Sequence, residues 1–257
     1  MIILTGGADL SVAYSVTLSA IIFSQIYDAT GSALAGFFAA MGAGLLIGIF
    51  KGLGVAVLGI TAMVMTLATN SILMSLAFLY TKGNIKGNAS PLLTFLAKES
   101  IFGFRYVVLL WFGIGIAVIF LLKKTVFGRK IFAIGSSLRV SRLSAIDTRL
   151  TLVSIYIIAT LMMSLAGVLL VGHMGFPNFT MGNGYQLVSI AAVVIGGTSI
   201  MGGHGSYLGT MGGVIIIYLI QSILTILNIA DAGKQIVNGV IILVILFVYG
   251  RGRKISA

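Results

Sequence analysis

The chain has 257 residues, of which 59% are hydrophobic and only 8% are charged, and its formal net charge is +11. Soluble domains carry about 25% charged residues, so this composition excludes a soluble protein and indicates a polytopic membrane protein. Cysteine is absent, which excludes disulfides, thiolate metal sites and a cysteine nucleophile. We assign the positive charge to cytoplasmic loops and expect no nucleic-acid partner, because lysine and arginine accumulate in the cytoplasmic loops of membrane proteins.

The sequence contains eight apolar segments that are candidates for crossing a bilayer, which takes about 20 residues of helix. They cover residues 10–26, 32–50, 53–79, 106–122, 151–171, 187–201, 207–228 and 235–249. The segment 53–79 is long and is expected to tilt or to contain a break. The segment 187–201 is short and is expected to end inside the membrane. The sequence therefore predicts an all-α fold, a transmembrane helical bundle of about eight spans.

Small residues recur every four positions in two of these regions. The series are Ser32, Gly36, Ala40, Gly44, Gly48 and Gly52, and then Gly205, Gly209 and Gly213. Residues four apart share one helix face, and a face of small residues lets a second membrane helix approach closely. For both series we favour packing within the chain over a subunit interface.

Basic residues orient the chain in the membrane. The loop 123–150 holds seven lysine and arginine residues against one acid, Asp147, and the tail 251–254 is also basic. Both are therefore expected on the cytoplasmic side, and the four spans between them agree with this placement. Counting backwards places the N-terminus and Lys51 on the cytoplasmic side and the loop 80–105 outside.

Few charges are expected inside the membrane, because all five acidic residues fall at span ends or in loops. Ion-driven carriers place ionisable groups within their spans, so this pattern favours a path for a neutral polar solute that is driven from outside the chain. The candidate path residues are Asp9, Thr66, Asn70, Asn183, Tyr185 and Gln186. The alternative for a helical threonine such as Thr66 is a structural bond to a carbonyl of its own helix.

The loop 123–150 is long for a connector, and loops of this length are often functional. Its central residues are Gly135, Ser136, Ser137, Leu138, Arg139, Arg142, Leu143, Ser144, Ala145 and Asp147. Gly135 and the two serines are expected to cap a short helix over 138–145, with Leu138, Arg142 and Ala145 on one face. Such a helix suits docking into a groove of a partner protein. The alternative is a helix that lies on anionic lipid head groups.

A second special segment interrupts apolar sequence between residues 190 and 209. It contains Gly196, Gly197, Thr198, Ser199, Gly202, Gly203, Gly205 and Gly209. In hydrocarbon such a break leaves backbone groups without hydrogen-bond partners, so it is tolerated only where protein or a water-lined cavity surrounds it. The sequence therefore predicts a buried, functional irregularity at this point. Phosphate-loop, zinc-protease and serine-elbow motifs are missing, and we expect no catalytic residue, metal site or bound cofactor in this chain.

Three blocks, at residues 3–12, 133–147 and 184–209, together resemble the permease subunits of ribose-type monosaccharide importers of the ATP-binding-cassette (ABC) class, in the branched-chain amino acid and ribose permease superfamily. The resemblance covers essentially the whole chain and implies one permease domain over residues 1–257. Two departures stand out. The family has glycine at the position of Ala145, and it has about two more spans before the first block, so a shortened form of a ten-span permease is expected.

The resemblance also implies partners and a location. ABC ATPase subunits, which bind ATP and magnesium, would dock on the loop containing 133–147. A second permease subunit would complete a homo- or heterodimer, and an extracytoplasmic sugar-binding protein would deliver the solute. The location would be the bacterial cytoplasmic (inner) membrane, with both termini cytoplasmic. Two alternatives remain open: a permease for branched-chain amino acids or nucleosides, and a secondary carrier or channel without an ATPase.

Overall fold

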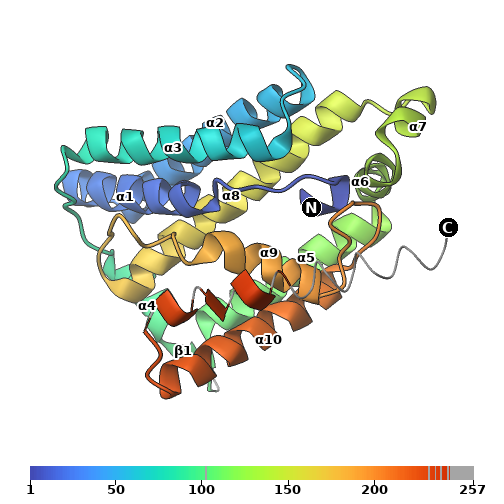
Figure 1. Cartoon of the computed structure of the whole chain (residues 1–257). Coiled ribbons are helices and arrows are strands. Elements are labelled where there is room, and N and C mark those ends of the chain that lie inside the picture. Colours follow the sequence, from blue (N-terminus) through green and yellow to red (C-terminus); the bar gives the residue numbers. More distant parts are fainter. Residues whose placement is uncertain (102, 231, 235, 238, 242, 244–257) are drawn as a thin grey trace.

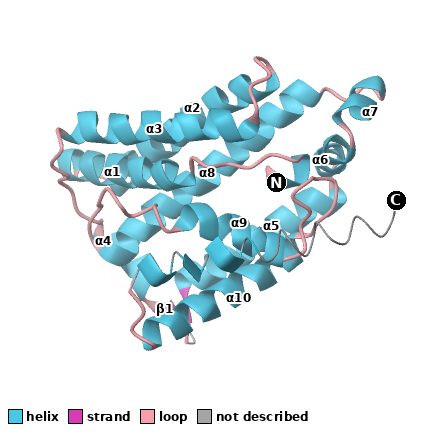
Figure 2. Ribbon diagram, in the orientation of Figure 1, coloured by secondary structure: helices cyan, strands magenta, loops and turns pink. Residues whose placement is uncertain are grey.

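The computed structural model of the chain describes residues 1–101, 103–230, 232–234, 236–237, 239–241 and 243. Helices dominate these residues (Figure 2), and the all-α prediction is confirmed. The helices are η1 (Ile3–Thr5, 3-10), α1 (Val12–Thr30), α2 (Ala33–Ala56), α3 (Ala62–Thr81), α4 (Pro91–Lys98), α5 (Tyr106–Lys124), α6 (Val126–Ser136), α7 (Leu138–Leu143), α8 (Thr148–Met174), α9 (Tyr185–Ile195) and α10 (Tyr207–Ile226). The sheet content of the described residues is one antiparallel pair, β1 (Ser100–Ile101) and β2 (Phe104–Arg105).

Five of the described helices, α2, α3, α5, α8 and α10, are long and apolar enough to cross a membrane. The remaining expected spans correspond to α1, to the short α9 and to 235–249, most of which lies outside the described residues. The break expected in 53–79 is confirmed, because α2 ends at Ala56 and α3 begins at Ala62. The predicted boundary after residue 50 is wrong, since α2 continues through Lys51.

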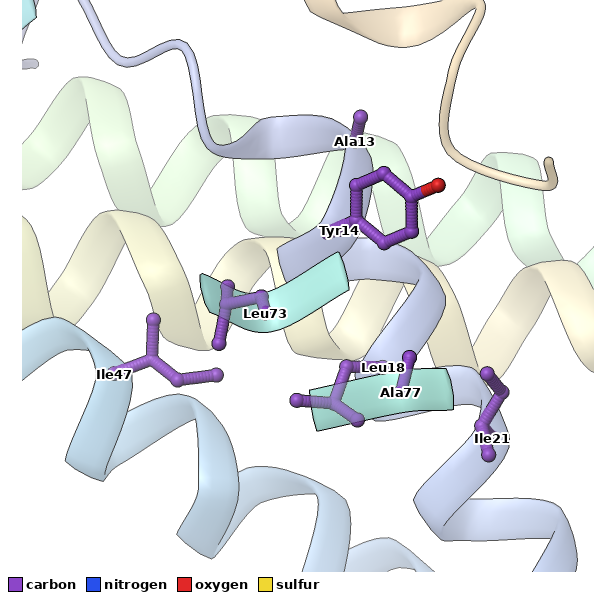
Figure 3. Close-up of a cluster of buried hydrophobic side chains, with 7 residues drawn as sticks. All are labelled: Ala13, Tyr14, Leu18, Ile21, Ile47, Leu73 and Ala77. Atoms are coloured by element: carbon purple, nitrogen blue, oxygen red, sulfur yellow. The ribbon is translucent and has the colours of Figure 1, made fainter. Parts of the chain in front are cut away.

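Helix α1 lies inside the bundle and packs against α2, α3 and α8. Its serines and threonines make α1 less apolar than a span that faces lipid. These polar side chains are tolerated because the surrounding helices shield them from the hydrocarbon. One core cluster forms around it, where Tyr14, Leu18 and Ile21 meet Ile47 of α2 and Leu73 of α3 (Figure 3). In Figure 1, α1, α2 and α3 lie on one side of α8, and α5, α9 and α10 lie on the other.

The small-residue faces are used within the chain, as predicted. A Cβ atom added at Gly44 would overlap Ser164 of α8, and one at Gly48 would lie 2.7 Å from the Cα of Ile157. On the other side of the molecule, Gly209 and Gly213 of α10 leave no room for a methyl group against the backbone of α9. Close backbone approach of this kind is how membrane helices associate without a hydrophobic driving force.

The two ends of the bundle carry different loops. Helices α6 and α7 lie at one end together with the N-terminus, whereas α4 and the short hairpin lie at the other (Figure 1). The loops 80–105 and 123–150 thus lie at opposite ends, as the span count requires. The cytoplasmic or external identity of each end remains a prediction.

Candidate functional site

Three segments that are far apart in the sequence meet at the end of the bundle that carries α6. The backbone N–H of Gly203, in the break between α9 and α10, donates a hydrogen bond of 2.9 Å to the carbonyl of Leu4 in η1. Gly135, near the end of α6, packs directly against this hydrogen bond. We call this meeting point, formed by Leu4, Gly135 and Gly203, the junction. Each of the three sequence blocks that carry the family resemblance contributes one of its residues.

The junction admits no side chain at Gly135, and the glycines of the break beside it are tightly packed. A Cβ atom at Gly135 would overlap the Leu4 carbonyl oxygen and lie 2.5 Å from the nitrogen of Gly203. At Gly202 it would lie 2.8 Å from the nitrogen of Gly6. Gly202 and Gly203 also have φ of 85° and 77°, a left-handed conformation that costs other residues energy. The glycines are therefore explained by backbone contact together with backbone conformation.

The break pairs part of its own backbone. The predicted burial is correct for Thr198, Gly202 and Gly203, but it is wrong for Gly197, Met201, His204 and Ser206, which are exposed. The nitrogen of Thr198 donates to the carbonyl of Val193 at 3.2 Å, and that of Ser199 to the carbonyl of His204 at 2.9 Å. Gly196 packs against Gly209, so that a Cβ atom on either would overlap the backbone of the other. Gly197 and Gly205 have φ of 81° and 156°. Short α9 and long α10 are thus held together across the break.

A buried ion pair lies at the start of α1. The ammonium nitrogen of Lys51 is 2.8 Å from Oδ2 of Asp9 and donates a second hydrogen bond of 2.9 Å to the hydroxyl of Ser11. Oδ1 of Asp9 accepts from both the backbone nitrogen and the hydroxyl of Ser11, at 2.8 and 2.6 Å. The placement of Lys51 at a cytoplasmic span end is therefore wrong: its side chain is fully buried inside the bundle.

Two of the candidate path residues hold the start of α1 in place. The first N–H groups of a helix, here including that of Tyr14, have no partner within that helix, and Leu10 lies just before α1. Thr66 accepts a 3.0 Å hydrogen bond from the nitrogen of Leu10, and Oδ1 of Asn70 accepts one of 3.3 Å from the nitrogen of Tyr14. Thr66 also donates to the carbonyl of Ala62 in its own helix, at 2.8 Å. These side chains of α3 allow α1 to begin within the bundle.

A cavity of about 460 Å³ lies between the N-terminal segment, α5, α8, α9 and α10. Its walls are mostly apolar: one face of α5 contributes residues from Val107 to Leu122, including Trp111. Residues 1–4 also form part of the wall. The polar residues of the wall are Asp9, Ser189, Thr198, Ser206, Tyr207 and Thr210. Mostly apolar walls with a few polar groups are typical of small-ligand sites.

Comparison with known proteins identifies the family of the chain. The family model described as branched-chain amino acid transport system / permease component matches residues 1–246. The chain belongs to this permease family. No solved structure matches the chain.

The relatives of this permease include three different transport proteins from Escherichia coli. The ribose import permease protein RbsC of strain K12 is 32% identical over 265 residues, which cover 96% of the chain and 78% of the relative. The L-arabinose transport system permease protein AraH of strain K12 is 30% identical, covering 93% of the chain and 73% of the relative. The autoinducer 2 import system permease protein LsrC of strain K12 / DH10B is 31% identical, covering 98% and 74%. These relatives are transporter components, which confirms that the permease is not an enzyme.

The expected helix of the long loop is present in the permease as α7, with corrections at both ends. It spans 138–143, and Ser137 alone caps it by accepting a 3.3 Å hydrogen bond from the nitrogen of Val140, because Gly135 and Ser136 belong to α6. Ser144 ends it, and Ala145 has a left-handed φ of 56°. The predicted face that included Ala145 is therefore wrong. Asp147 caps α8 instead, accepting from the nitrogen of Leu150 at 2.9 Å.

The outer surface of α7 is largely apolar. Leu143, Val140 and Leu138 are 82%, 60% and 39% exposed. Arg139 and Arg142 are exposed beside them, and Arg142 also donates from Nε to the hydroxyl of Thr148 at 3.4 Å. An exposed apolar surface with a basic neighbour suits contact with another protein.

Of the six candidate path residues, only Asp9 lies in the wall of the cavity. Asn183, Tyr185 and Gln186 lie around the start of α9, outside the cavity wall. Sequence reasoning missed Lys51, which is 42 positions from its partner. It also missed Leu4, which acts through its backbone carbonyl. The only available signal for Lys51 was a charge placed within a series of small residues.

Proposed function

We propose that this permease is the solute-translocating subunit of an ABC importer that moves a monosaccharide across the bacterial cytoplasmic membrane. The relatives named for ribose and L-arabinose support the choice of a sugar. The relative named for autoinducer 2 and the superfamily description keep other small solutes as alternatives. Transport would be driven by separate ATPase subunits that bind ATP and magnesium. A second permease subunit and an extracytoplasmic sugar-binding protein would complete the importer.

One observation carries this proposal: the exposed helix α7 begins three residues after Gly135 of the junction. A protein that docks on α7 would therefore act on the junction and, through it, on the cavity wall, since Leu4 belongs to both. The basic loop that contains α7 is cytoplasmic in this proposal, which places the ATPase where ATP is available. The N-terminal segment would then be cytoplasmic as well.

The cavity is the candidate route for the solute. The carboxylate of Asp9 can accept hydrogen bonds from sugar hydroxyls, and the hydroxyls of Thr198 and Tyr207 can donate or accept them. The apolar remainder of the wall would hold a sugar weakly, and passage requires a site that releases its solute as well as binding it. Binding strength would then come from the extracytoplasmic binding protein.

The docking assignment is tested by charge reversal. We expect Arg139→Glu with Arg142→Glu to lose the co-purifying ATPase and sugar uptake, while the chain still inserts into the membrane. The matched control is Lys82→Glu with Lys86→Glu, which makes the same charge change at the other end of the bundle and should keep the ATPase. Unchanged uptake by the arginine variant would refute the docking assignment. Solute uptake into liposomes by the permease alone would favour a secondary carrier or channel.

The cargo is tested by competition. Uptake of labelled ribose by the reconstituted importer should fall when unlabelled ribose or arabinose is added, and should not change with leucine or a nucleoside. Inhibition by leucine alone would assign the permease to amino-acid transport.

A further inference from the structure

We propose that the junction of Leu4, Gly135 and Gly203 is a rigid joint, which carries movement of α7 to the wall of the cavity. This inference rests on the proposed function, because it requires an ATPase that moves α7. Leu4, Gly135 and Gly203 act here as positioning residues, through backbone contact. The joint explains why the three sequence blocks converge on one point.

The connection from α7 to the joint contains no flexible linker. Only Ser136 and Ser137 separate Gly135 from Leu138, the first residue of α7. The hydroxyl of Ser136 donates a 3.0 Å hydrogen bond to the carbonyl of Phe132 in α6, and the hydroxyl of Ser137 caps α7. Both serines are thus part of helical hydrogen bonding. A displacement of α7 is therefore passed to the end of α6 without a flexible linker.

The connection from the joint to the cavity runs along two segments. Residues 1–4 form part of the cavity wall, and Leu4 accepts the hydrogen bond from Gly203. The break that contains Gly203 also contributes Thr198 and Ser206 to the same wall. A displacement of the joint therefore changes the cavity wall from two sides at once.

The joint is stiff because it consists of backbone against backbone. A Cβ atom at Gly203 would lie 3.1 Å from the Cα and the nitrogen of Ser136, and one at Gly202 would lie 2.9 Å from the carbonyl oxygen of Gly135. Side chains in such a contact could change rotamer and absorb a movement, whereas close-packed backbone transmits it. Rigid, closely packed elements are among those that carry coupling between distant sites.

The first test places a wedge in the joint. Gly135→Ala adds a methyl group against Leu4 and Gly203, whereas Gly42→Ala and Gly113→Ala are controls, because nothing lies within 4 Å of an added Cβ atom at either position. The measurement is the number of sugar molecules transported per ATP hydrolysed by the purified, assembled importer. We expect this ratio to fall about tenfold in Gly135→Ala and to stay unchanged in both controls.

The number of sugar molecules transported per ATP hydrolysed distinguishes a role of Gly135 in transmitting movement from a role in folding alone. A structural defect lowers the amount of assembled importer but leaves the ratio of the assembled fraction as it is. An unchanged ratio in Gly135→Ala overturns the joint and leaves the proposed function standing. If the unaltered chain shows no ATP-dependent transport, the proposed function itself fails.

The second test locks the joint and does not depend on the folding of Gly135→Ala. The chain has no cysteine, so Ser136→Cys with Gly203→Cys introduces the only pair. A Cβ atom at Gly203 would lie 3.1 Å from the Cα of Ser136, which places the two within reach of a disulfide. A rigid joint predicts that the oxidised importer keeps the ratio of the reduced one. Loss of transport on oxidation, restored by reduction, would show that the segments must separate, and would overturn the rigid joint.

Discussion

Lys51 of α2 and Asp9, which precedes α1, form an ion pair 2.8 Å long inside the bundle, with the lysine side chain fully buried. Ionisable groups within the membrane are costly and are retained where they pair with one another. The pair ties the N-terminal segment to α2, while the same segment reaches the junction at Leu4. Asp9 thus lines the cavity, and its ion pair with Lys51 also fixes the N-terminal segment that forms part of the cavity wall.

The pair makes a prediction about stability. Lys51→Met should lower the free energy of unfolding by about 3–5 kcal/mol, because it leaves the Asp9 carboxylate buried without its partner. Lys51→Met combined with Asp9→Asn removes both charges and should recover most of that loss. The measurement is the fraction of permease that remains monodisperse in mild detergent after heating. A double variant no more stable than the single one would show that the cost is not electrostatic.

Thr66 and Thr69 provide a matched test of how α1 begins. Both are buried in α3 and donate to a carbonyl of their own helix, at 2.8 Å in each case. Only Thr66 also accepts a hydrogen bond from another segment, from the nitrogen of Leu10. Thr66→Val should therefore cost about 1 kcal/mol of stability, because a partly buried N–H group loses its partner.

Thr69→Val removes only a bond within the helix and should cost less than Thr66→Val. The comparison uses thermal unfolding of both variants under the same detergent conditions. Equal losses would mean that the contact to Leu10 contributes nothing to stability.

Much of the fold could be predicted from the sequence, because the signals are local. The apolar segments, an interruption of the long segment 53–79 and the short α9 follow from hydropathy and length, and the four-residue spacing of Gly44, Gly48 and Gly52 marks the face that meets α8. Hydropathy does not define where helices begin and end. Ser137, and not Gly135, caps α7, since the turn geometry depends on where α6 ends.

The site was harder to predict because its contacts are between distant segments or involve the backbone. The pairing of Asp9 with Lys51 spans 42 residues, and no local spacing encodes it. The hydrogen bond between Gly203 and Leu4 uses groups that every residue carries. Thr66 was predicted from its chemistry as a path residue, and the structure places its hydroxyl against the start of α1, where it accepts from Leu10.

Gly42 and Gly44 test the packing of α2 against α8. A Cβ atom at Gly44 would overlap Oγ of Ser164, which also accepts a 2.8 Å hydrogen bond from Ser19. Gly44→Ala should therefore cost about 1–3 kcal/mol through overpacking. Gly42, two residues earlier, has nothing within 4 Å of an added Cβ atom, and Gly42→Ala should stabilise α2 by about 0.5–1 kcal/mol. Thermal unfolding of the two variants should move in opposite directions, and a shift of the same sign in both would contradict close packing at Gly44.

Ala145 lies in a conformation that favours glycine. Its φ is 56°, and its nitrogen donates a 3.3 Å hydrogen bond to the carbonyl of Arg142, so the residue makes the turn that ends α7. A side chain in the left-handed region costs about 1–2 kcal/mol. Ala145→Gly relieves this strain but also frees the unfolded chain, so we expect a net gain of about 1 kcal/mol, seen as a higher melting temperature.

The control for Ala145→Gly is Ala133→Gly in α6, which should instead cost about 0.5–1 kcal/mol because glycine weakens a helix interior. Since the substitution leaves the exposed side chains of α7 unchanged, relief of strain should leave the proposed docking on α7 intact. The amount of co-purifying ATPase should therefore not fall in Ala145→Gly. A lower melting temperature in this variant would mean that the alanine methyl group makes contacts that outweigh its backbone strain, and the turn after α7 would then be a packed element.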